Sequence, residues 1–65
     1  MKHYLLVIWG DIEPELIKCN GVGERDRKAK ELKEEHGDDN GMFMLSIDRK
    51  GNARIGAYSG GFFEN

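Results

Sequence analysis

Residues 42–58 carry the pattern that most constrains this fold, because a turn and the alternation on both sides of it predict the same β-hairpin. Residues 48–52, DRKGN, have the composition of a type I turn followed by a glycine in the left-handed conformation. Pairing Asp48 with Asn52 places apolar residues opposite one another on one face, namely Ile47 and Ala53, Leu45 and Ile55, and Phe43 and Ala57. The second face then carries Ser46 opposite Arg54, Met44 opposite Gly56, and Met42 opposite Tyr58.

Residues 3–9, HYLLVIW, predict a strand that is apolar on both faces. The segment is too short for a helix, is rich in aromatic and branched side chains, and ends at Gly10. A strand of this kind usually lies inside a sheet with a layer on each side. Residues 15–19, ELIKC, follow Pro14 and predict a weaker second strand, paired with the first through an acidic turn.

Residues 24–36 predict a helix, because strong helix formers fill the segment and Gly37 stands where a left-handed C-cap belongs. Its apolar stripe is narrow and consists of Val22, Ala29 and Leu32, so one helix can cover one face of a sheet. The predicted class is α+β, an antiparallel three- to four-stranded sheet with one helix packed on one face, in the order β-(β)-α-β-β. We expect one small domain over residues 1–65, with residues 59–65 as a flexible C-terminal tail.

Composition excludes several classes of protein. A chain of 65 residues with a single cysteine has a thin core and no intramolecular disulfide, and a lone thiol fits a reducing compartment, so we expect a cytoplasmic protein. The longest apolar run has six residues, Tyr4 to Trp9, far short of the roughly 18 to 20 that a membrane span needs. We therefore expect a soluble protein with no membrane partner. A formal net charge of −2 argues against binding driven by nucleic-acid phosphates.

The residues that carry catalytic or metal chemistry form no motif in this sequence. His3, His36 and Cys19 stand far apart, without the short spacing of a metal motif. The Gly21-Val22-Gly23 segment lacks the third glycine and the lysine of a phosphate loop, so we interpret it as the loop that begins the helix. We predict no catalytic residue, no metal and no cofactor, and therefore no enzyme.

Apolar side chains occupy more faces than one narrow helix can cover. The hairpin's second face would stay open unless the C-terminal phenylalanines fold back over it, and otherwise it is an interface. Our hypothesis is a small cytosolic protein–protein interaction module, of adaptor or inhibitor type, or a self-associating domain that forms a homodimer. The residues that we expect at the interface are Met42, Met44, Tyr58, Trp9, Tyr4, Phe62 and Phe63.

A single-stranded nucleic-acid binder is the alternative hypothesis. Such a protein would stack bases on sheet aromatics and hold the phosphates with nearby cations, and the residues that fit these roles are Tyr4, Tyr58, Lys2 and Arg54. The acidic balance and the opposite placement of Phe43 and Tyr58 in the hairpin argue against it, so we do not expect a nucleic-acid partner. The order of an acidic turn, a charged helix and a hairpin ending at residues 58–61, YSGG, is similar to that of short bacterial reading frames, and this likeness implies no activity. Free-standing chains of this size are also common in phages.

Overall fold

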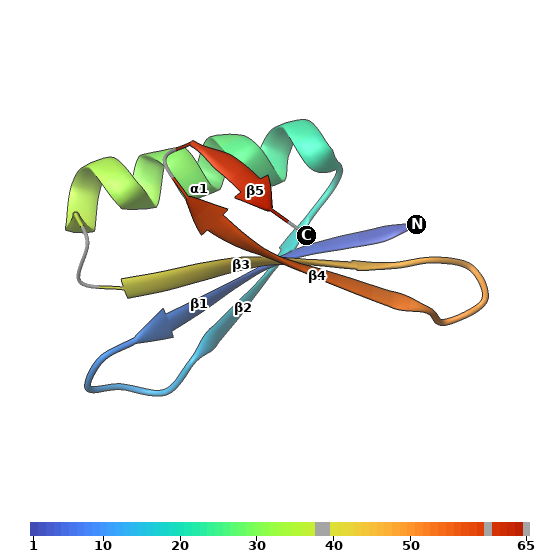
Figure 1. Cartoon of the computed structure of the whole chain (residues 1–65), viewed down its shortest axis with the longest axis horizontal. Helices are drawn as coiled ribbons and strands as arrows, with labels where there is room; N and C mark the ends of the chain where they lie inside the picture. Colours follow the sequence, from blue (N-terminus) through green and yellow to red (C-terminus); the bar gives the residue numbers. More distant parts are fainter. Residues whose placement is uncertain (38–39, 60, 65) are drawn as a thin grey trace.

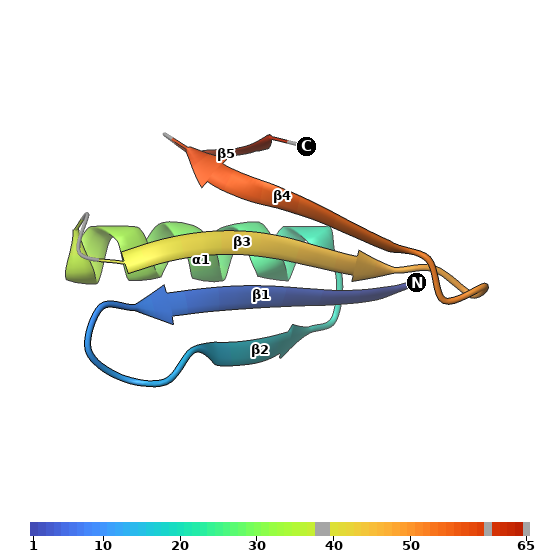
Figure 2. The same cartoon turned by 60° about the horizontal axis from the view of Figure 1, so that its bottom comes forward.

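The computed structural model describes residues 1–37, 40–59 and 61–64, and shows one helix lying on one face of an antiparallel sheet (Figure 1). The elements, in chain order, are β1 (Lys2–Trp9), β2 (Glu15–Cys19), α1 (Val22–His36), β3 (Asn40–Ile47), β4 (Ala53–Ser59) and β5 (Phe62–Glu64). The strand order is β2-β1-β3-β4-β5, so β1 lies inside the sheet as its two apolar faces predict (Figure 2). The predicted α+β class is confirmed, and the described residues add a fifth strand to the predicted three or four.

The β3–β4 hairpin has the predicted register, with Phe43 opposite Ala57, Leu45 opposite Ile55, and Ile47 opposite Ala53. Gly51 adopts a left-handed backbone with φ of 87°, as the turn composition predicts. The Asp48 carboxylate closes the turn by accepting hydrogen bonds from the backbone N–H groups of Lys50 and Asn52, both at 2.9 Å. The turn therefore fixes the register in which β3 and β4 pair.

We expect this turn to weaken in acid. The backbone N–H of Asn52 holds the pKa of Asp48 below its ordinary value, so the charged carboxylate is favoured in the folded state. Because the pKa of Asp48 is lower in the folded state than in the unfolded state, the charged carboxylate adds to the free energy of unfolding. This contribution is complete above the unfolded carboxyl pKa of about 4 and is lost as the pH falls through the folded pKa. Asp48→Ala should therefore lower the thermal midpoint at neutral pH, with a difference from wild type that shrinks by about pH 2.5. A difference of the same size at both pH values, followed by circular dichroism, would contradict this account.

The core lies between α1 and the sheet face that carries Leu5, Val7 and Met42. Leu5, Val7 and Ala29 are fully buried, because alanine in the middle of the helix lets it approach the sheet closely. Val22, predicted in the apolar stripe, is 46% exposed, and the Arg25 side chain is buried in the first turn instead. The helix ends as predicted, since Gly37 has φ of 67° and its N–H donates to the Lys33 carbonyl.

The face that the helix covers is the opposite of the one that we expected. The β1–β3 register places Leu5 beside Met44 and Val7 beside Met42, and α1 packs over this methionine face. The physical reason is chirality: β2 and β3 run parallel on either side of β1, and crossovers between parallel strands are almost always right-handed. Figure 2 shows a right-handed crossover from β2 through α1 to β3. This handedness decides on which side of the sheet α1 lies, independently of which hairpin side chains point to that side.

Within the expected C-terminal tail, residues Phe62–Glu64 pair with β4 as strand β5. Phe63 lies opposite Tyr58, and their rings meet edge to face with centroids 5.0 Å apart. Phe63 thus folds back over the methionine face, as one of the two interpretations of the sequence proposed, whereas Phe62 is 76% exposed. Gly60 and Asn65 of the predicted tail lie outside the described residues.

Candidate functional site: an open apolar sheet face

The sheet surface opposite α1 is apolar across four neighbouring strands, and we call it the open face. Alternation and register assign ten apolar residues to it: Tyr4, Leu6 and Ile8 of β1, Leu16 of β2, Phe43, Leu45 and Ile47 of β3, and Ala53, Ile55 and Ala57 of β4. Figure 2 shows the sheet from this side, with α1 behind it. No helix or strand of the described residues lies over this face.

These side chains form continuous rows rather than scattered apolar positions. One row runs across the strands through Leu16, Leu6, Phe43 and Ala57, and the next runs through Tyr4, Leu45 and Ile55. Ile55 is 64% exposed and Leu16 is 55% exposed. Contiguous apolar surface of this kind is uncommon on a monomeric protein.

Charged side chains stand at the two edges of the open face. Lys18 lies on β2 in the row of Tyr4, and Lys2 lies beside Ile47 at the end of β1. Glu64 lies opposite Ala57 on β5, at the far edge of the sheet. The apolar centre is therefore bounded by Lys18 on the β2 side, by Lys2 at one end of β1, and by Glu64 on the β5 side.

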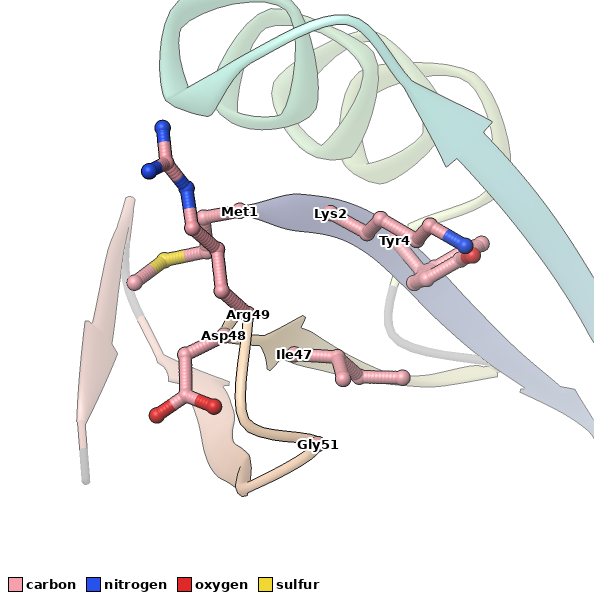
Figure 3. Close-up of a pocket in the computed structure, with 7 residues that line it drawn as sticks. All are labelled: Met1, Lys2, Tyr4, Ile47, Asp48, Arg49 and Gly51. Atoms are coloured by element: carbon pink, nitrogen blue, oxygen red, sulfur yellow. The ribbon is translucent and has the colours of Figure 1, made fainter.

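A hollow of about 370 Å³ lies at the end of this face, beside the β3–β4 turn (Figure 3). Lys2, Tyr4 and Ile47 line one side of it, while the side chains of Asp48 and Arg49 point away from them. Its polar groups do not converge on a common point, so the hollow has no arrangement suited to general acid–base or nucleophilic chemistry.

The predicted interface residues are divided between the two faces. Met42 and Met44, expected to be exposed, are core residues at 4% and 7% exposure, so that expectation is wrong. Trp9, Tyr58 and Phe63 are partly buried against the core on the helix side. Tyr4 and Phe62 alone among the seven predicted residues belong to the opposite side of the sheet.

The residues that sequence reasoning missed are Leu6, Phe43, Leu45 and Ile55, which form the centre of the open face. The hairpin register did place Phe43, Leu45 and Ile55 on one shared face, and that signal was available. Alternation alone does not show which of the two hairpin faces lies under the helix. That depends on the order of the strands in the sheet, which the sequence pattern does not reveal.

The residues of the nucleic-acid hypothesis are also divided. Lys2 and Tyr4 belong to the open face, whereas Arg54 and Tyr58 belong to the face that α1 covers. One strand of nucleic acid could not contact all four. The open face does, however, carry both Tyr4 and Phe43, which lie in adjacent rows of neighbouring strands, since Tyr4 pairs with Leu45 and Phe43 with Leu6.

Cys19 is buried at 4% exposure, and its thiol lies 3.7 Å from the Ile17 carbonyl oxygen. Burial raises the pKa of this thiol, so the reactive thiolate is disfavoured at neutral pH. We expect a thiol reagent to modify the native protein at least about tenfold more slowly than the protein unfolded in denaturant. Equal rates of modification, measured by absorbance, would show that Cys19 is accessible.

Comparisons with known proteins add no relationship, since no protein family, curated protein or solved structure matches this chain. Within residues 1–37, 40–59 and 61–64, no three His, Cys, Asp or Glu side chains gather in a group that could hold a metal ion. In the same part of the chain, the helix is neither long nor apolar enough to cross a membrane. The open face is thus the strongest candidate site.

Proposed function

We propose that this protein is a small interaction module that forms a homodimer by stacking the open faces of two copies. The observation that carries the proposal is the continuous apolar surface around Leu6, Phe43, Leu45 and Ile55, over which no described element lies. Two antiparallel sheets packed in this way, about 10 Å apart, make a β-sandwich with a helix on each outer side.

The open face has the area of a small protein–protein contact. Strands about 4.8 Å apart, rising about 3.3 Å per residue over seven residues, give a face of roughly 20 by 23 Å. Two such faces together bury roughly 900 Å², which corresponds to the small interfaces of weak or transient protein–protein contacts. The exposed fractions of Ile55 and Leu16 show that their burial would remove substantial apolar surface from water.

The edge charges favour a second copy over an unrelated partner. A two-fold axis along β3, the middle strand of the sheet, places β2 of one copy over β5 of the other. Lys18 of each copy would then approach the edge that carries Glu64, so opposite charges meet at both rims. This self-complementarity is what an isologous interface requires.

The test is the solution mass of the untagged protein, measured by light scattering across a concentration series. The expected result is twice the 7.4 kDa mass of the chain at micromolar concentration, with dissociation on dilution. A monomer that persists to about 100 µM would overturn the homodimer, because a dissociation constant weaker than this corresponds to less than about 5.5 kcal/mol of binding free energy.

A monomer that binds an oligonucleotide would support the alternative function instead. Tyr4 and Phe43 share the open face with Lys2 and Lys18, an arrangement on which bases could stack. The excess of twelve acidic over ten basic residues disfavours this function, and salt-sensitive binding to mixed-sequence single strands would be its signature. The proposed compartment is the cytoplasm, since a chain with one buried free thiol is suited to reducing conditions.

A further inference from the structure

A second hollow lies on the helix side of the sheet, away from the open face, and we call it the basic hollow. Its volume is about 260 Å³, and Met1 and Val22 line it together with His3, Arg25, Met44, Ser46, Arg54 and Phe63. Because these side chains belong to the helix-covered side, stacking of the open faces would leave the basic hollow accessible.

Strand register builds the floor of the basic hollow. His3 of β1 lies opposite Ser46 of β3, which in turn lies opposite Arg54 of β4, so three polar side chains form one row on the face under α1. His3 Nδ1 and Ser46 Oγ are 3.1 Å apart, and this hydrogen bond ties the first two together. In the neighbouring row the residue opposite Met44 is Gly56, which has no side chain to fill the space.

The Arg25 guanidinium is held in place above this floor. Its Nη1 lies 3.3 Å from Met44 Sδ, and its central carbon stands 4.7 Å from the centre of the Phe63 ring. Its Nε and Nη2 donate to Asp26 Oδ1 at 3.0 and 2.8 Å. The Arg25 side chain is only 9% exposed, so its position in the first turn of α1 is fixed by packing as well as by charge.

The charge of the basic hollow differs from that of the whole chain. Arg54 forms no ion pair with any residue that the structure describes, and no Asp or Glu lines the hollow. Asp26 offsets the charge of Arg25, which leaves the charge of Arg54 unbalanced in a protein whose net charge is −2. A concave site with two guanidinium groups, a hydroxyl and an imidazole is suited to an anion.

We propose that the basic hollow binds a phosphate group, either free or as the monoester of a small molecule. Arg54 offers a forked pair of N–H donors that matches the oxygens of phosphate, and Arg25 keeps one further N–H on each of Nη1 and Nη2 beyond those that contact Met44 and Asp26. The Ser46 hydroxyl donates to Met44 Sδ at 3.8 Å, so it forms part of the floor and is not a free donor. The volume is below the roughly 300 Å³ at which pockets for drug-sized ligands begin, so the ligand is a phosphate with few additional atoms.

The test is a titration of the ¹⁵N-labelled protein with inorganic phosphate and, separately, with glycerol 3-phosphate, at constant pH and ionic strength. The expected result is a saturable shift of the backbone amide signals of His3, Ser46 and Arg54. Tighter binding of the ester would assign the site to a phosphate monoester, and equal or tighter binding of inorganic phosphate would assign it to the free ion. Shifts that are absent, or that rise linearly to about 20 mM phosphate in both titrations, would overturn the proposal.

Two matched variants separate this site from general attraction of anions. Arg54→Gln should raise the dissociation constant at least about tenfold, because it removes an exposed guanidinium that forms no ion pair with the residues that the structure describes. Arg49→Gln removes the same charge from the β3–β4 turn, outside the basic hollow, and should leave the dissociation constant within about twofold. Equal weakening by both variants would show that net charge alone attracts phosphate.

Discussion

Replacing Ile55 with aspartate should convert the proposed dimer into a monomer. Ile55 is 64% exposed on the open face of one chain, so the change should be tolerated by the isolated fold. In the stacked dimer the same carboxylate would be buried against apolar side chains, at a cost of several kcal/mol per copy. We expect the dissociation constant to rise at least about 100-fold, equivalent to about 2.7 kcal/mol, measured by sedimentation or light scattering.

Ile12 offers a matched control for this experiment. It is also an exposed isoleucine, at 67%, but it belongs to the turn between β1 and β2 rather than to the open face. Ile12→Asp should therefore leave the dissociation constant unchanged. If Ile55→Asp stays dimeric with a native circular dichroism spectrum, the interface lies elsewhere. If both variants dissociate the dimer equally, added negative charge is responsible and the open face is not.

The second large effect is expected at Leu5, which is fully buried between β1 and α1. Truncating a buried leucine to alanine removes apolar contacts and leaves a cavity, at a cost of about 2–5 kcal/mol. A chain of 65 residues has a total free energy of unfolding of about 3–10 kcal/mol. Leu5→Ala should therefore remove a large part of the stability, and the unfolding midpoint in urea should fall accordingly.

This comparison is best made in the Ile55→Asp background, because dimer formation would otherwise add stability that depends on concentration. Leu16→Ala is the matched control, since Leu16 is 55% exposed on the edge strand β2. Its truncation should change the free energy of unfolding by less than about 1 kcal/mol in the monomer. Equal losses from Leu5→Ala and Leu16→Ala would mean that the open face is covered within one chain.

The two predictions follow from the same property of the fold. One helix packs on β1, β2 and β3 from one side, so the sheet has a core on one face only. A domain of this size buries a modest fraction of its surface, and a second apolar layer would complete the other side. Dimer formation would thus make the free energy of unfolding depend on protein concentration. The Leu5 variant tests the stability of the single chain, and the Ile55 variant tests the contribution of the dimer.

Local patterns in the sequence were sufficient to predict the helix, four of the five described strands and one register. The turn at residues 48–52 and the alternation around it specify the β3–β4 pairing. Gly51 and Gly37 both have the positive φ that their positions predict, although ψ of Gly37, −139°, is not that of a left-handed helical cap. These features depend on interactions between residues close in the chain, such as the acceptor role of Asp48. The short strand β5 was missed because three residues carry too little pattern to predict pairing.

The candidate site depended on information that is not local. Strand alternation groups Phe43, Leu45 and Ile55 on one face and Met42 and Met44 on the other, but it does not say which face is covered. That choice follows from the strand order β2-β1-β3 and from the right-handed crossover through α1. The sequence by itself determined which side chains share a face, because alternation is a property of each strand. Only the tertiary structure decided which face became the core, because chirality acts on strands that are neighbours in space.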